Sequence, residues 1–100
     1  MAFKPIVKEK VIGGVTYKAQ FNGVSAMFDA TTQADGDNRK LVDYLLNNVL
    51  VEPKIDDMDE YFGTDVDLMN EVIEFASAVM RADKEYFPKP DKKAVKKESN

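Results

Sequence analysis

Apolar and polar residues alternate along the first quarter of the chain, which is typical of a half-buried β-strand. In segment 15–21 every second residue is apolar, and β-branched residues are frequent in segment 6–12. Only Gly13 and Gly14 lie between the two segments. The pattern therefore predicts a β-hairpin over residues 6–21 with a two-residue loop.

A strict two-residue loop also fixes which residues face each other. It places Glu9 opposite Lys18, which is favourable, and Lys10 opposite Tyr17. Lys8 and Lys10 then lie on the apolar face of the hairpin. Two explanations are open: the lysine stems extend along a sheet edge to reach water, or a β-bulge shifts the register.

The spacing of apolar residues becomes helical after the hairpin. Segment 24–31 has this spacing and predicts a short helix, with a third strand as the alternative. The polar stretch 31–38 is expected to be an exposed loop. A broad apolar stripe then predicts a helix over 39–50, capped by Asp37 or Asn38.

Proline and glycine mark where the remaining elements end. Pro53 ends the helix over 39–50 and makes 51–55 an extended connector. A short helix is expected over 56–62, with Gly63 as its stop. The longest helix is expected over 65–86, because its apolar residues repeat at 3-4-3 spacing and Thr64–Asp67 fits a variant capping box. Pro88 and Pro90 forbid its continuation.

These elements predict an α+β fold in one domain spanning residues 1–87. A small N-terminal antiparallel hairpin or sheet is expected to pack against a C-terminal bundle of about three or four helices. Residues 88–100 are expected to form a disordered basic tail. In the tail five lysines outweigh Asp91 and Glu98, which gives a net charge of +3.

Composition excludes several classes of function. The 100 residues include no cysteine and no histidine, which removes thiolate and imidazole chemistry, the usual zinc ligands and most enzyme templates. The net charge of −4 argues against a general nucleic-acid binder. No apolar stretch is long enough to span a membrane, and the N-terminus lacks the pattern of a secretory signal. We therefore expect neither an enzyme nor a cofactor.

The acidic cluster around residues 52–67 is the one candidate for a metal site, and its spacing fails. A calcium loop that starts at Asp57 would place Phe62 where glycine is required and Leu68 where the bidentate glutamate belongs. Carboxylates near two helix N-termini explain the cluster instead. No metal site is expected.

The middle of the chain resembles a known family. The segment Leu45–Ile55, with the sequence LLNNVLVEPKI, is similar to the "LL…V-V-x-P-K-I" core of the small tail assembly chaperones of long-tailed bacteriophages. The order of the neighbouring segments is similar too: a strand pair with Gly14–Tyr17, a short segment like 24–30, an acidic region at 56–59 and a helix like 66–80. The resemblance covers residues 10–85.

This resemblance implies a non-enzymatic role. Such chaperones bind the long helical tape measure protein in the cytoplasm of the infected host and keep it soluble until the tail tube polymerises around it. They are absent from the finished virion and often self-associate. Many are also made in a longer, frameshifted form, whose extension is thought to recruit tail tube protein.

A chaperone of exposed apolar helices needs an apolar groove and a charged exterior. Our hypothesis is that helices 39–50 and 65–82 share the face that supplies the groove, and that its two methionines adapt to varied apolar partners. The candidate partner-binding residues are Leu41, Tyr44, Leu45, Met69, Val72 and Met80. The same residues could instead form the core, and the sequence leaves both possibilities open.

Two other functions remain open. One is a structural tail or head–tail connector subunit that stays in the virion. The other is a host-directed binder whose acidic face mimics nucleic acid, which would require clustered charge and strongly salt-dependent binding.

Overall fold

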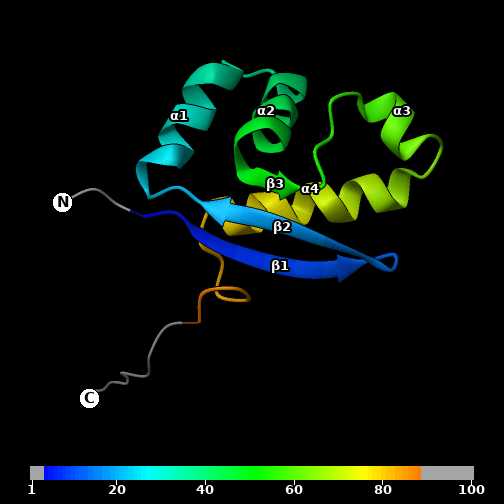
Figure 1. Ribbon diagram of the computed structural model, residues 1–100. Coiled ribbons are helices and arrows are strands. Elements are labelled where there is room, and N and C mark those ends of the chain that lie inside the picture. Colours follow the sequence, from blue (N-terminus) through cyan, green and yellow to red (C-terminus); the bar gives the residue numbers. More distant parts are fainter. Residues whose placement is uncertain (1–3, 89–100) are drawn as a thin grey trace.

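The computed structural model describes residues 4–88 and has the predicted α+β architecture (Figure 1). Three antiparallel strands form one sheet in the order β1 (Ile6–Ile12), β2 (Val15–Phe21), β3 (Leu50–Glu52). The helices are α1 (Ser25–Ala34), α2 (Asn38–Tyr44), the π-helical turn η1 (Leu45–Val49), α3 (Met58–Phe62) and α4 (Val66–Met80). In Figure 1, α4 runs behind the hairpin and the other helices lie above it.

The hairpin has the register of a strict two-residue loop. Gly13 and Gly14 have φ angles of 60° and 80°, which is a type I′ turn and is compatible with the twist of the two strands. Glu9 faces Lys18 and Lys10 faces Tyr17. Because the pairing runs from Ile6 to Ile12 without a shift, the bulge explanation was wrong for this hairpin.

The two lysines on the inner face are held by aromatic residues that follow α4. Lys8 Nζ lies 4.9 Å from the centre of the Phe87 ring, which is a cation–π contact. A side-chain hydrogen bond with Tyr86 raises the pKa of Lys10. The Phe87 ring also lies 5.3 Å from that of Phe21. The lysine stems therefore extend over an aromatic edge of the core, as the first of the two explanations requires.

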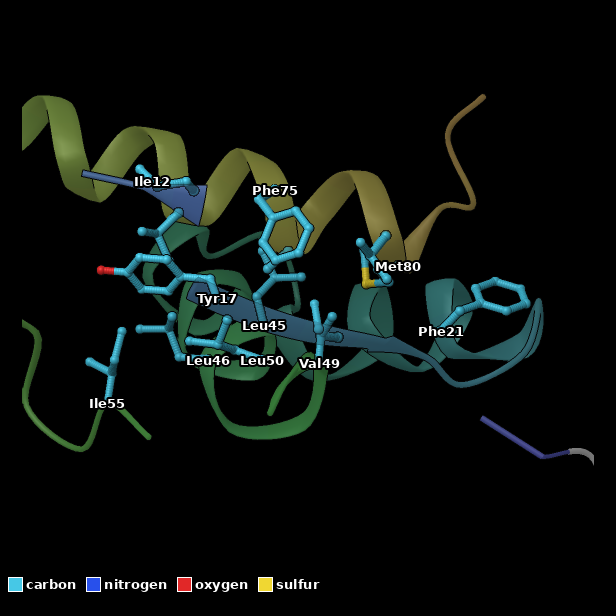
Figure 2. Close-up of a cluster of buried hydrophobic side chains, with 14 of the residues drawn as sticks. Ile12, Tyr17, Phe21, Leu45, Leu46, Val49, Leu50, Ile55, Phe75 and Met80 are labelled. Atoms are coloured by element: carbon cyan, nitrogen blue, oxygen red, sulfur yellow. The ribbon is translucent and has the colours of Figure 1, made fainter. Parts of the chain in front are cut away.

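The core lies between the sheet and α4. Val72, Phe75 and Val79 of α4 are at most 1% exposed, and they pack with Tyr17 of β2 in one apolar cluster. Figure 2 shows Phe75 pointing from α4 into this cluster beside Leu45. The element that the apolar spacing predicted most clearly thus supplies much of the core.

Helix α4 ends six residues earlier than predicted. The predicted helix 65–86 stops at Met80, because Ala82 adopts a left-handed conformation with φ 52°. The Ala82 N–H donates to the Val79 carbonyl and the Asp83 N–H donates to the Ala78 carbonyl. This pair of bonds is a Schellman motif, and it turns the chain so that Tyr86 and Phe87 return toward the sheet.

Helix α1 is longer than expected. Residues 24–31 were predicted to be helical, which is confirmed, but the helix continues to Ala34 into the expected loop 31–38. Its buried residues are Ala26, Ala30 and Ala34, a four-residue repeat that packs against α2. Alanine favours the helix and permits this close approach of two helices.

The predicted helix over 39–50 is divided into two parts. Asp37 caps α2, since its side chain accepts from the backbone N–H groups of Arg39 and Lys40. The helix then widens into the π-helical turn η1. The chain continues as β3, where Leu50 pairs with Ala19 at an irregular register. The sequence predicted an extended connector near this point but not a third strand.

Aspartates cap the two remaining helices. The Asp57 side chain accepts from the N–H groups of Asp59 and Glu60, so α3 begins at Met58 rather than at residue 56. Asp65 accepts from the Leu68 N–H and is the N-cap of α4, where Thr64 was predicted. These caps confirm the helix-terminus interpretation for part of the acidic cluster. The predicted basic tail lies outside the described residues after Pro88.

Candidate partner-binding groove

A groove of about 400 Å³ lies between α2 and α4. Six apolar side chains line it: Leu41, Val42, Leu45, Met58, Met69 and Ile73. Five polar residues complete its lining: Asn38, Arg39, Asn70, Glu74 and Ser77. An apolar hollow with a polar border has the chemistry that an amphipathic helix requires of its binding site.

The helical repeat explains why these residues come together. Leu41 and Leu45 are four residues apart, as are Met69 and Ile73, so each pair lies on one side of its helix. Leu45 is only 2% exposed and belongs to the core, whereas Leu41, Met69 and Ile73 are partly buried. The groove is therefore the point where the apolar core reaches the surface between two helices.

Three of the six predicted partner-binding residues line this groove, namely Leu41, Leu45 and Met69. Val72 and Met80 are 0% and 8% exposed, lie in the core and do not line the groove. For these two residues the structure agrees with the alternative that the sequence left open.

The sixth predicted residue, Tyr44, faces a different hollow. This hollow of about 310 Å³ is lined with Gln33, Lys40, Asp43, Asn47 and Asn48. Burial and, to a smaller extent, the charge of Asp29 raise the pKa of Tyr44. Tyr44 is therefore not placed to act together with Leu41, Leu45 and Met69.

Sequence reasoning missed three apolar residues of the groove. Ile73 follows Met69 by four residues and Val42 precedes Leu45 by three, so the helical repeat could have indicated both. Met58 lies at the start of α3, and only the tertiary fold brings it beside α2 and α4. Its sequence position carries no signal of this contact.

A strongly acidic hollow adjoins the groove. It has a volume of about 340 Å³ and includes four aspartates, Asp43, Asp56, Asp57 and Asp59. Arg39 and Met58 line both the groove and this hollow. The Arg39 Nε atom lies 3.4 Å from an Asp43 carboxylate oxygen. In the described part of the chain, no three acidic residues are arranged to hold a metal ion.

The apolar surface continues from the groove toward α1. A hollow of about 270 Å³ shares Asn38 and Leu41 with the groove and extends to Thr31 and Ala34 of α1. At the start of α1, Val24 and Phe28 are each 74% exposed. These two side chains add exposed apolar surface to the start of α1.

Comparisons with known proteins add no relative to this description. No protein-family model, curated protein or solved structure matches the chain. Separately, none of the helices within residues 4–88 is both long enough and apolar enough to cross a membrane.

Proposed function

We propose that the protein is a tail assembly chaperone of a long-tailed bacteriophage, which binds helical segments of the tape measure protein and keeps them soluble during tail assembly. The observation that carries this proposal is the apolar groove between α2 and α4. The resemblance of segment 45–55 to the core of this chaperone family also supports it. The role requires no catalytic residue.

The chemistry of the groove lining suits a helical partner. A bound helix presents apolar residues at positions i, i+3, i+4 and i+7, and such a stripe matches a groove between two helices. Met58 and Met69 lie on two different elements at this surface. Because methionine side chains are flexible and polarisable, they adapt to different partner side chains, which favours binding to many segments of a long protein.

The test is co-expression with the tape measure protein encoded nearest to this chain. The expected result is that the partner stays soluble and elutes together with this protein. A groove variant, Met69→Asp, should lose this effect. The matched control is Val66→Asp, since Val66 is on the same helix but is 58% exposed outside the groove.

Two outcomes would contradict the proposal. One is that the tape measure protein remains insoluble and does not co-elute with the unaltered chain. The other is abundant protein in purified virions, detected by mass spectrometry, which would instead indicate a structural tail or connector subunit.

A further inference from the structure

We infer that the groove selects an amphipathic helix that carries lysine or arginine at one end of its apolar stripe, with the basic end over the four aspartates beside Met58. The inference rests on the proposed helix-binding role of the groove. It adds the sign of the charge on the partner helix and the end of the groove that binds the charged residues.

The position of the aspartates follows from the residues that the two hollows share. Arg39 and Met58 belong to both, so the acidic hollow begins where the groove reaches α3. One further helical turn adds about 5.4 Å. A helix that fills the groove past Met58 therefore brings its next side chains over the aspartates.

Part of this acidic charge is not neutralised within the molecule. Asp57 is engaged as the cap of α3, and Asp43 pairs with Arg39. Among residues 4–88, Asp56 and Asp59 form no ion pair. Both are exposed, so a partner can reach their carboxylates without unfolding α3.

The other charges at the groove do not offset these aspartates. Glu74, which also lines the groove, pairs with Arg81 at 2.9 Å. Of the described residues that line the groove and the acidic hollow, Arg39 alone is basic. A cationic helix end is therefore attracted to this place, and an anionic one is repelled.

The same charge pattern disfavours a second copy of this chain as the occupant. Residues 22–88 hold fifteen acidic and five basic side chains, and they include every described helix. The charged side chains of α1, α3 and α4 are all acidic, so these helices of another copy would bring further acidic charge to the aspartates. Helix α2 carries Arg39 and Lys40, but it already forms one wall of the groove in its own copy. The occupant is therefore a helix of different composition.

The test uses three synthetic helical peptides of 18 residues with the same leucine and alanine stripe. One carries lysines at one end, the second has glutamates there, and the third has glutamines. Binding to the full-length protein is measured by isothermal titration calorimetry at low and at physiological salt. The lysine peptide should bind about tenfold more tightly than the glutamate peptide at low salt, and added salt should reduce this ratio.

Protein variants then locate the effect. Asp56→Asn with Asp59→Asn should weaken binding of the lysine peptide by about threefold to fivefold and leave the glutamine peptide unchanged. The matched control is Glu71→Gln with Glu85→Gln, which makes the same change in net charge beside Lys10 on the sheet side. This control should change binding by less than about twofold.

Arg39→Gln provides a test with the opposite sign. It keeps most of the side-chain stem in the groove but removes the positive charge, so the Asp43 carboxylate loses its ion pair with Arg39. Binding of the lysine peptide should therefore tighten by about twofold to threefold. A purely structural role of Arg39 would instead weaken the binding of all three peptides.

The inference is overturned if the three peptides bind equally, or if the Asp56/Asp59 variant and the Glu71/Glu85 control weaken the lysine peptide equally. Its failure is distinguishable from failure of the proposed function. Equal binding of all peptides together with rescue of the tape measure protein would leave the chaperone role intact. Selective binding of the lysine peptide without such rescue would support the groove's selectivity and contradict the chaperone role.

Discussion

The two sides of α4 differ in what covers them. Toward the sheet, Val72, Phe75 and Val79 are at most 1% exposed and are packed against β2 and η1. Toward α2, Met69 and Ile73 are partly buried and line an open groove. Because the apolar stripe of α4 is wider than the contact with the core, its remaining apolar residues form a surface. The same helical repeat thus supplies both stability and a binding site.

The largest expected effect is on the core side. Val72→Asp places a carboxylate where the exposed fraction is 0%, among apolar side chains. We expect a loss of at least about 4 kcal/mol of folding free energy, enough to remove cooperative unfolding from a domain of this size. Circular dichroism and thermal unfolding measure this loss. A cooperative transition close to that of the unaltered protein would show that this side of α4 is not core.

The same change on the groove side should affect binding instead. Met69→Asp places its carboxylate at an open surface, so we expect a stability loss of about 1 kcal/mol and retention of the fold. Binding of an apolar helix should weaken by about tenfold or more. Calorimetry with the glutamine peptide, next to thermal unfolding, separates the two effects. Unfolding by Met69→Asp, or unchanged peptide affinity, would contradict the distinction between the two sides.

Alkaline pH should lower the free energy of unfolding, because Tyr17 in the core is harder to deprotonate in the folded protein than in the unfolded chain. Its burial, assisted by a 2.8 Å hydrogen bond between its hydroxyl and that of Tyr61, raises the pKa of Tyr17. The unfolded tyrosine loses its proton near pH 10, while the folded one keeps it. The stability linked to this shift is therefore complete below pH 10 and is lost as the pH rises further, by about 1 kcal/mol at pH 11.

Urea unfolding at pH 8 and pH 11 measures this loss. Tyr17→Phe should lose less stability between the two pH values than the unaltered protein. Tyr61→Phe, which removes the hydrogen bond but not the burial of Tyr17, should keep most of the loss. An equal loss in the Tyr17→Phe variant would assign the alkaline effect to other groups.

The smallest expected effect lies at the end of α4. Ala82 has φ 52°, a conformation that glycine adopts without steric cost. Ala82→Gly should therefore stabilise the protein by about 0.5–1 kcal/mol, measured by thermal unfolding. Ala78→Gly, inside the same helix and 3% exposed, should destabilise it. A loss of stability in Ala82→Gly would mean that the alanine methyl group contributes packing at this turn.

The sequence predicted what depends on local repeats. The hairpin and its two-residue loop followed from Gly13 and Gly14, although the sequence left the register open between a strict loop and a β-bulge. The fold class followed from the change between two-residue and helical spacing. The end of α4 was not predictable, because alanine at position 82 gives no sign of a left-handed residue. The strand β3 was missed because three residues carry too short a pattern, and their pairing with β2 is a tertiary contact.

The candidate site was only partly predictable for a related reason. Spacing places Met69 and Val72 on one broad apolar stripe of α4, but it does not say which of them another element covers. That depends on where α2, η1 and the sheet pack. Met58 reaches the groove only through the path of the chain after β3.

The inward-facing lysines of β1 also affect how copies of this protein associate at high concentration. β1 is an edge strand, and its sequence from Ile6 to Ile12, IVKEKVI, reads the same in both directions. If two copies paired antiparallel along this edge, the centred register would set Lys8 against Lys10 and Glu9 against Glu9. Registers moved by two residues would oppose identical lysines. Like charges face each other in each case. The exposed edge therefore resists edge-to-edge strand pairing, through which unpaired edge strands form aggregates.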